Sequence, residues 1–337
     1  MRAAVLRGPK DVVLEERPRP RPGPGEVLVR VLSVGVCGSD THYYDHGRIG
    51  RFVVEAPLIL GHEASGDVAE LGPGVTGLAV GQRVSIEPGV PDLTCQHCLA
   101  GRYNLCPDMR FLATPPVDGA FAEYVAVHAA FAHPVPGSIG DDAAALLEPL
   151  SVGVWACRKG RVTAGSRVLI TGAGPIGLVC VQTAIAFGAT EVVVSDVNPS
   201  RLALAQELGA TAVVDVRESS VTTLDRPPEV LLECSGHPPA IGEAIRVLGR
   251  AGRAVLVGMG GDEIPLPLSV LQEREIELTG TFRYANTWPT AIGLVASGRV
   301  DLDRLVTGTY RLEEVEQALT AGRRDDRAVK VVVRPTT

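Results

Sequence analysis

The stretch Val168-Leu-Ile-Thr-Gly-Ala-Gly-Pro-Ile-Gly177 is the strongest indication of fold in the central part of the chain. An apolar run is followed by the glycine pattern Gly172-x-Gly174-x-x-Gly177 and then by a predicted helix over 175–187. A strand, this pattern and a helix in succession form the context that a dinucleotide-binding βαβ unit requires. Gly172 permits the tight turn, Gly174 removes a side chain where a pyrophosphate approaches, and Gly177 lets the helix pack closely on the strand. The helix N-terminus then faces the phosphates with its positive dipole end.

Around this stretch, apolar runs and helical patterns alternate. The alternation predicts a parallel sheet covered by helices on both faces. The predicted strands are 167–171, 191–195, 212–214, 230–233 and 253–258, and the further helices are 199–208 and 239–248.

Asp196 directly follows the second of these strands, 19 positions after Gly177. An acidic residue at this place can accept hydrogen bonds from the adenosine ribose hydroxyls, and its charge repels the 2′-phosphate of NADP. We therefore expect NAD as the cofactor. Arg201 leaves an alternative open, because it can pair with a phosphate.

The first 130 residues have a different texture. Short valine-rich runs are broken by glycine and proline, which predicts a β-rich, barrel-like domain with strands at 26–34, 61–71, 81–86 and 120–127. A length of 337 residues favours two domains over one. The overall prediction is an α/β chain in which a barrel precedes a doubly wound sheet.

Composition excludes several classes of function. The net charge of -7 argues against a nucleic-acid partner. No apolar stretch approaches the length of a membrane span, and the N-terminal apolar run is too short for a signal peptide, so we expect a cytoplasmic protein. Seven cysteines, an odd number, do not suggest a disulfide framework in that compartment and draw attention to metal binding.

Two groups of residues have the chemistry of zinc ligands. Cys37 lies about 25 positions before the pair His62 and Glu63, and a thiolate, an imidazole and a carboxylate can hold a catalytic zinc with one position open. The second group is Cys95-x2-Cys98-x7-Cys106, which lacks a fourth ligand for a closed structural site. Asp92 continues the spacing of three and can supply an oxygen. His97 is the alternative fourth ligand, and three free thiols are the alternative to a site.

These features together resemble the medium-chain dehydrogenase/reductase superfamily, and within it the sorbitol (polyol) dehydrogenase family. The stretches that carry the resemblance are Val34-Gly-Val-Cys-Gly-Ser-Asp-Thr-His-Tyr43, His46-Gly-Arg-Ile-Gly50, Leu60-Gly-His-Glu-Ala-Ser-Gly66, Gly101-Arg-Tyr-Asn-Leu-Cys106, Phe111-Leu-Ala-Thr-Pro-Pro116, Leu147-Glu-Pro-Leu-Ser-Val-Gly153 and Phe282-Arg-Tyr-Ala-Asn-Thr-Trp-Pro289. They span nearly the whole chain. One departure is Asp92, which stands where the family's structural zinc loop has its first cysteine.

The resemblance implies a GroES-like catalytic domain formed by residues 1–147 and 281–337, and a Rossmann NAD-binding domain formed by 148–280. It implies one catalytic zinc per subunit, a second, structural zinc, and a homotetramer. The implied metal ligands are Cys37, His62 and Glu63, with Glu148 as a ligand or as a contact of the zinc-bound water, and Asp92, Cys95, Cys98 and Cys106 for the second ion. The implied substrate contacts are Tyr43, Glu148, Arg283 and Tyr284. The implied cofactor contacts are Gly172, Gly174, Pro175, Ile176, Gly177, Asp196, Arg201, Val257, Gly258, Met259, Thr281, Phe282 and Arg283.

The reaction implied is the transfer of hydride from a secondary hydroxyl of a polyol to NAD, giving a ketose. Ser39 and His42 are three residues apart on an expected helical turn and can relay the proton to water, with Glu148 as a base; His42 can instead be purely structural. The alternatives are a zinc dehydrogenase for threonine or a vicinal diol, and a non-catalytic NAD-binding protein of the same fold.

Overall fold

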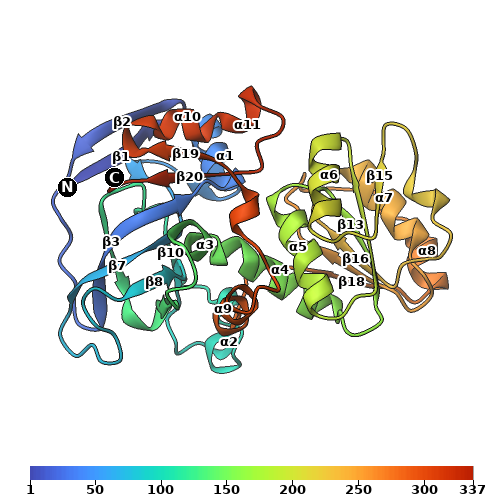
Figure 1. Ribbon diagram of the computed structural model, residues 1–337, viewed down its shortest axis with the longest axis horizontal. Coiled ribbons are helices and arrows are strands. Elements are labelled where there is room, and N and C mark those ends of the chain that lie inside the picture. The colour runs from blue at the N-terminus through green and yellow to red at the C-terminus, as the bar shows by residue number, and fades with distance from the viewer. Residues whose placement is uncertain (337) are drawn as a thin grey trace. The chain divides into compact units, whose positions relative to one another are not determined.

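The computed structural model describes residues 1–336 and separates into two compact units. Unit 1 runs from Met1 to Glu148 and resumes at Leu302, and unit 2 is Pro149–Asp301 (Figure 1). The first predicted boundary, at residues 147 and 148, lies within a residue of this division. The second was predicted at 280 and 281, whereas the structure keeps the chain in unit 2 up to Asp301. Hydrogen bonds explain this, because Arg158 donates to the carbonyl of Asn286 and Gln182 donates to the carbonyl of Asp301.

The main sheet of unit 1 is built around the long strand β3, Glu26–Gly35. One edge of β3 pairs antiparallel with β7, while the other edge pairs with β11 near its start and with β20 near its end. The sheet order is β12-β8-β7-β3-β20-β19 with β11 beside β3. Valines of β3 are fully buried in the core beside Leu6, Ile86 and Phe121. Strand β20, from the end of the chain, thus completes a sheet begun near residue 26.

The strands of unit 1 are β1 Arg2–Gly8, β2 Asp11–Glu16, β3, β4 Arg48–Ile49, β5 Phe52–Val53, β6 Leu58–Ile59, β7 Glu63–Leu71, β8 Arg83–Ile86, β9 Gly89–Val90, β10 Arg110–Phe111, β11 Tyr124–His128, β12 Ala132–Pro134, β19 Val306–Arg311 and β20 Lys330–Arg334. Its helices are α1 Gly38–His46, α2 Gln96–Leu99, α3 Asp141–Ala145, α10 Val315–Leu319 and α11 Ala321–Arg324. The strand predicted over 120–127 begins only at Tyr124, because the amides of Ala120 and Phe121 donate to Gly61 and Leu60 outside any ladder.

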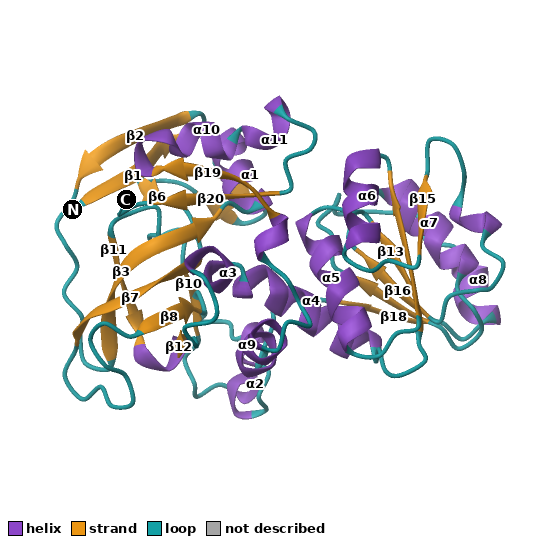
Figure 2. Cartoon of the chain, in the orientation of Figure 1, coloured by secondary structure: helices purple, strands orange, loops and turns teal. Residues whose placement is uncertain are grey.

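Unit 2 contains one parallel sheet in the order β15-β14-β13-β16-β17-β18. Helices α5 and α6 cover one face, and α7 and α8 cover the other (Figure 2). The inner strand β13 is apolar along most of its length because both faces are covered, and its residues Val168, Leu169 and Ile170 are buried. The strand order changes direction at β13, because β14 and β15 lie on one side of it and β16, β17 and β18 lie on the other. The predicted doubly wound sheet is confirmed.

The elements of unit 2 are α4 Leu147–Gly160, which crosses from unit 1, then β13 Arg167–Thr171, α5 Pro175–Ala186, β14 Glu191–Asp196, α6 Pro199–Glu207, β15 Ala212–Asp215, β16 Val230–Glu233, α7 Pro238–Val247, β17 Arg253–Leu256, α8 Leu268–Glu273, β18 Glu277–Gly280 and α9 Trp288–Ala296. Strand β17 stops two residues before the predicted end, because the amides of Val257 and Gly258 both turn to the carbonyl of Glu233. Within residues 1–336, no helix combines the length and apolar character that a membrane crossing demands.

Candidate functional site

Helix α1 starts immediately after Cys37 and orients the first group of candidate residues. The Asp40 side chain accepts a hydrogen bond from the Cys37 amide at 3.0 Å and so closes the first helical turn. Ser39 and His42 lie one turn apart on α1, as predicted; Ser39 is half-buried and His42 is exposed. Tyr43 is 4% exposed.

The same aspartate also fixes the second candidate segment. Asp40 Oδ1 accepts the Gly61 amide at 2.9 Å and lies 3.6 Å from Nδ1 of His62. Asp40 is only 1% exposed, so water does not compete for these contacts. A carboxylate next to one imidazole nitrogen orients the ring so that the other nitrogen points away from the carboxylate. Metal-binding histidines are usually oriented by such a contact.

The structure brings the three predicted catalytic zinc ligands together. The ligand atoms of Cys37, His62 and Glu63 all lie within 4.8 Å of one another, although they come from two segments about 25 residues apart. Burial acts to lower the pKa of His62, but the charge of Asp40 and the Cys37 thiol raise it well above its ordinary value. The imidazole must give up this proton before it can bind a metal.

Glu63 shows that the cluster suits a cation. Its Oε1 accepts a hydrogen bond from the Lys330 ammonium at 2.5 Å, and the ammonium also donates to the carbonyl of Val36 at 2.9 Å. Its Oε2 is buried and has no hydrogen-bond partner among the described residues. An unpaired carboxylate oxygen in the interior is costly. Cys37, His62 and Glu63 would hold a zinc ion, and a cation bound by the carboxylate would remove that cost.

Glu148 lies in the first turn of α4 and is 5% exposed. Burial acts to lower the pKa of Lys330, whereas the negative charges of Glu63, Cys37 and Glu148 raise it. Glu148 therefore acts electrostatically on the same buried lysine as two of the candidate ligands.

The second predicted metal group is also assembled. The ligand atoms of Asp92, Cys95, Cys98 and Cys106 lie within 4.8 Å of one another, and the Cys95 and Cys98 sulfurs are 3.4 Å apart. His97, the alternative fourth ligand, lies in α2 and is not in this group.

Local hydrogen bonds prepare Asp92 for this position. Its Oδ1 accepts the amides of Cys95 and Thr94 at 2.9 and 2.8 Å, which lowers the pKa of the carboxyl to about 2. Burial and the neighbouring Cys95 raise the pKa of Cys98 to about 12. Such crowded sulfurs share negative charge only when a cation lies between them, so the donor set fits a structural zinc.

The glycine turn of unit 2 has the backbone geometry predicted for Gly172 and Gly177. Gly172 has a φ of 87°, in the left-handed region. A Cβ on Gly177 would lie 1.8 Å from the carbonyl oxygen of Gly172, so only glycine permits this packing. A Cβ on Gly174 would meet nothing within 4 Å, which leaves open space at the N-terminus of α5. Pro175 and Ile176 form the first helical positions there.

Asp196 ends β14 and faces the same turn. Its Oδ2 accepts the amide of Ala173 at 2.5 Å, and its Oδ1 accepts the amide of Asn198 at 2.8 Å. The carboxylate therefore lies against the glycine turn. Arg201 lies in the first turn of α6, where Asn198 caps its amide at 3.1 Å.

The remaining predicted cofactor and substrate contacts follow β17 and β18. Met259 and Phe282 are 69% and 53% exposed, and a Cβ on Gly258 would lie 2.4 Å from the Gly236 amide nitrogen. Arg283 adopts a φ of 55° and holds its guanidinium 4.9 Å from the Phe282 ring centre. Val257 follows the end of β17, and the amide of Thr281 donates to Leu256. Tyr284 is buried, with its ring 5.2 Å from that of Trp288.

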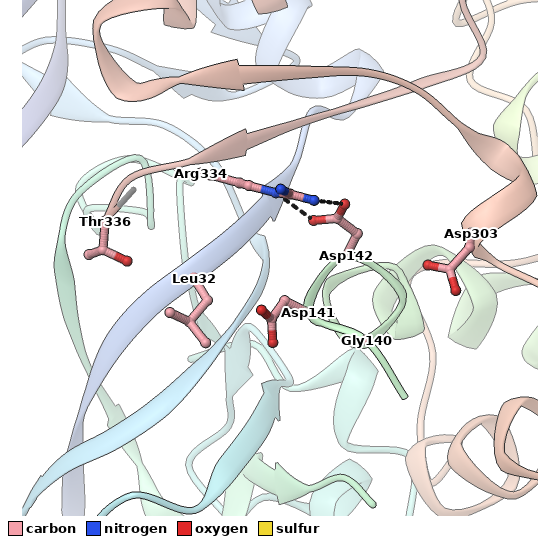
Figure 3. Close-up of a pocket in the computed structure, with 7 residues that line it drawn as sticks. All are labelled: Leu32, Gly140, Asp141, Asp142, Asp303, Arg334 and Thr336. Atoms are coloured by element: carbon pink, nitrogen blue, oxygen red, sulfur yellow. Dashed lines mark hydrogen bonds and ion pairs between the residues drawn. The ribbon is translucent and has the colours of Figure 1, made fainter. Parts of the chain in front are cut away.

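A pocket of about 270 Å³ in unit 1 includes none of the predicted site residues (Figure 3). Arg334 forms a two-point ion pair with Asp142 across it, and Ser33 donates to the same carboxylate. These bonds tie β3, α3 and β20 together. The ion pair that lines this pocket is therefore structural, and its two charges already pair with each other.

Sequence reasoning missed Asp40 and Lys330. Asp40 carried a usable signal, since an acidic residue three positions after Cys37 is the pattern of a capping box. Lys330 directly precedes the apolar run 331–333. A lysine at the start of a buried strand indicates a buried partner. Which partner it meets cannot be inferred locally, because Glu63 is 267 positions away.

Comparison with known proteins places these two units in a defined class. Residues 23–137 match the alcohol dehydrogenase GroES-like domain, and residues 175–297 match the zinc-binding dehydrogenase domain. The fold and the two donor clusters thus define a zinc-binding dehydrogenase with a GroES-like and a Rossmann-like part.

Full-length relatives refine this class. The chain is 43% identical to the sorbitol dehydrogenase of Bacillus subtilis, covering 99% of this chain and 97% of that protein. It is 45% identical to the sorbitol dehydrogenase of Homo sapiens, covering 93% and 90%. The solved structure of L-idonate 5-dehydrogenase from Escherichia coli superimposes with a TM-score of 0.93 at 33% identity, covering 99% and 98%. The chain belongs to the sorbitol dehydrogenase family of zinc-containing medium-chain dehydrogenases.

Proposed function

We propose that this chain is an NAD- and zinc-dependent dehydrogenase that oxidises a secondary hydroxyl of a polyol of the sorbitol, L-iditol or xylitol type to a ketose. The observation that carries the proposal is the buried group of Cys37, His62 and Glu63 in a chain that also has the Gly172–Gly177 turn and Asp196. The relatives named sorbitol dehydrogenase support the polyol as substrate.

Cys37, His62 and Glu63 would hold the catalytic zinc, and Glu148 would contact it directly or through water. When bound, zinc supplies a Lewis acid that favours the alkoxide form of a substrate hydroxyl near neutral pH. Asp40 keeps His62 and the Cys37 amide in place for this task. Three protein ligands leave a position for substrate oxygen.

The proton of the hydroxyl must leave a buried place. Ser39 is half-buried and His42 is exposed one turn later on α1, so the pair leads from the interior to the surface. We assign them the relay, with Glu148 as the alternative first acceptor. Tyr43, Glu148, Arg283 and Tyr284 would offer polar atoms to the remaining hydroxyls of a polyol, which suits a substrate with several oxygens.

The glycine turn and the start of α5 would hold the pyrophosphate of NAD, and Asp196 would hold the adenosine ribose. When bound, NAD accepts the hydride. The cofactor contacts at 257–259 and 281–283, the second zinc at Asp92, Cys95, Cys98 and Cys106, a homotetrameric assembly and a cytoplasmic location belong to the same proposal.

The test is NADH formation from a panel containing sorbitol, L-iditol, xylitol, threonine and a vicinal diol, before and after zinc removal. We expect activity on the polyols, loss of activity on chelation and recovery with added zinc. Preference for threonine or the diol would replace the polyol assignment, and undiminished turnover without zinc would reject the metal-based part. Light scattering tests the tetramer.

A further inference from the structure

In the buried pair of Lys330 and Glu63, the two oxygens of the Glu63 carboxylate have different surroundings. Lys330 donates to Oε1 at 2.5 Å, and Oε2 has no hydrogen-bond partner among the described residues. The two side chains are 4% and 1% exposed, so no solvent evens out this difference. The carboxylate thus presents one occupied oxygen and one unoccupied oxygen.

The lysine is itself held in place. Its ammonium donates to the carbonyl of Val36 at 2.9 Å, next to Cys37, and its backbone belongs to β20, which pairs with the end of β3 at Val34 and Gly35. A side chain anchored at the backbone and at two acceptors cannot follow the carboxylate if the latter rotates. Lys330 therefore holds one oxygen of Glu63 at a fixed place.

The choice of lysine is informative. The chain has lysine only at positions 10, 159 and 330, and all the other residues of its lysine and arginine total are arginine. An arginine fork binds both oxygens of a carboxylate, whereas an ammonium acts as a point donor to one. A point donor is the cation that leaves the second oxygen available.

Resting on the zinc site proposed above, we infer that Lys330 is a positioning residue that makes Glu63 a one-oxygen ligand and so keeps a coordination position open for substrate. Without the lysine, both carboxylate oxygens become available to the ion, and a two-oxygen contact fills the position that a catalytic zinc reserves. The proposed role is one of positioning, because Lys330 is buried and acts on the metal site through Glu63.

The test uses Co²⁺ in place of zinc, because the visible bands of Co²⁺ lose intensity when four-coordination becomes five-coordination. Spectra are recorded for the full chain and for Lys330→Met. The spectrum of Cys37→Ser, which keeps the Asp92, Cys95, Cys98 and Cys106 group, is subtracted to remove the second site. We expect the bands of the Met variant to fall several-fold while one cobalt remains at the site. Bands of unchanged intensity would overturn the inference.

The double variant Glu63→Gln with Lys330→Met separates this effect from a general distortion. It carries no charge in the buried pair, which protects folding, and its amide offers only one oxygen. We expect bands as strong as those of the native chain, whereas bands as weak as those of the single variant would contradict the inference. If the native chain itself shows no sulfur-to-cobalt absorption above the Cys37→Ser reference, the zinc site has failed rather than the role of Lys330.

Discussion

Single residues determine whether the candidate metal ligands Cys37, His62 and Glu63 can come together. Gly35 pairs with Glu63 across β3 and β7, and a Cβ at Gly35 would lie 2.0 Å from Glu63 Oε2 and 3.0 Å from a methyl group of Leu146. Glycine here has an ordinary extended backbone, so the requirement is space and not conformation. The Glu63 carboxylate thus lies in the space that Gly35 leaves free and contacts Lys330.

We predict that Gly35→Ala displaces the Glu63 carboxylate and reduces the zinc retained at the Cys37 site, at a cost in stability of about 1 to 3 kcal/mol from overpacking. Zinc content after dialysis and urea unfolding measure the two effects. Gly38→Ala is the matched control, because a Cβ at Gly38 meets nothing within 4 Å. Full zinc content in the Gly35 variant would show that the carboxylate adapts.

Under the proposed function, Asp196 is the single residue that selects NAD over NADP. We predict that Asp196→Ala weakens NAD binding by about 1.5 to 3 kcal/mol, the usual contribution of hydrogen bonds to a charged group, and reduces the preference for NAD over NADP. Titration of both cofactors measures this. Asp215→Ala is the control, because Asp215 is the register partner of Asp196 at the end of β15. Equal effects of the two substitutions would remove the special role of Asp196.

At the scale of elements, short segments hold the sites in place through contacts with distant segments. Helix α1 packs on α10, and the Tyr44 hydroxyl donates to Glu316 Oε1 at 2.6 Å. Burial and then the Glu316 carboxylate raise the pKa of Tyr44 to about 12. The phenol must stay protonated to make this contact, which links the attachment of α1 to pH.

The pH dependence follows from that raised pKa. The unfolded chain has a tyrosine pKa of about 10, so the contribution is complete below pH 10 and is lost as the pH rises from about 10 through about 12. We predict that this residue accounts for about 2 to 3 kcal/mol of stability lost across that window. Unfolding free energies of the native chain and of Tyr44→Phe, measured at pH 9 and in steps toward pH 12, should converge. A constant difference between them would contradict the prediction.

The loop from Asp92 to Cys106 is the second element with a testable role. We predict two zinc ions per chain and only one after Asp92→Ala, because three thiols alone leave a closed site incomplete. Asp108→Ala is the control, since Asp108 is exposed two positions after the end of this loop and is not in the ligand group. Metal analysis decides between two ions, one ion and the alternative of three free thiols.

At the scale of the whole molecule, the candidate residues for zinc and those for the dinucleotide belong to different units. Both donor clusters lie in unit 1, while the glycine turn and Asp196 lie in unit 2. A ligand stabilises the unit that binds it, by about 2.7 kcal/mol at a hundredfold excess over its dissociation constant.

We therefore predict distinct patterns in hydrogen exchange. Chelation should speed exchange in α1, β3 and β7, whereas NAD should slow exchange in β13, α5 and β14. Mass spectrometry of peptides from both units measures the effects. Protection of unit 1 alone by NAD, in the absence of added metal and substrate, would contradict the assignment of the dinucleotide site.

Features with local physical causes could be predicted from the amino-acid sequence alone. The period of apolar residues, the glycine pattern at Gly172–Gly177 and the ligand types at Cys37, His62 and Glu63 predicted the parallel sheet, its turn and the residues that meet. Segment ends were predicted to within a few residues, and they shifted where distant amides competed for carbonyls, as at Ala120 and Val257.

Features that depend on segments far apart in the chain became visible only once the chain was folded. The return to unit 1 at Leu302, the support of His62 by Asp40 and the pairing of Lys330 with Glu63 all arise from packing between distant strands and helices. The physical reason is that charge pairing in a core depends on which side chains share a space without water. No local pattern around residue 330 contains the position of residue 63.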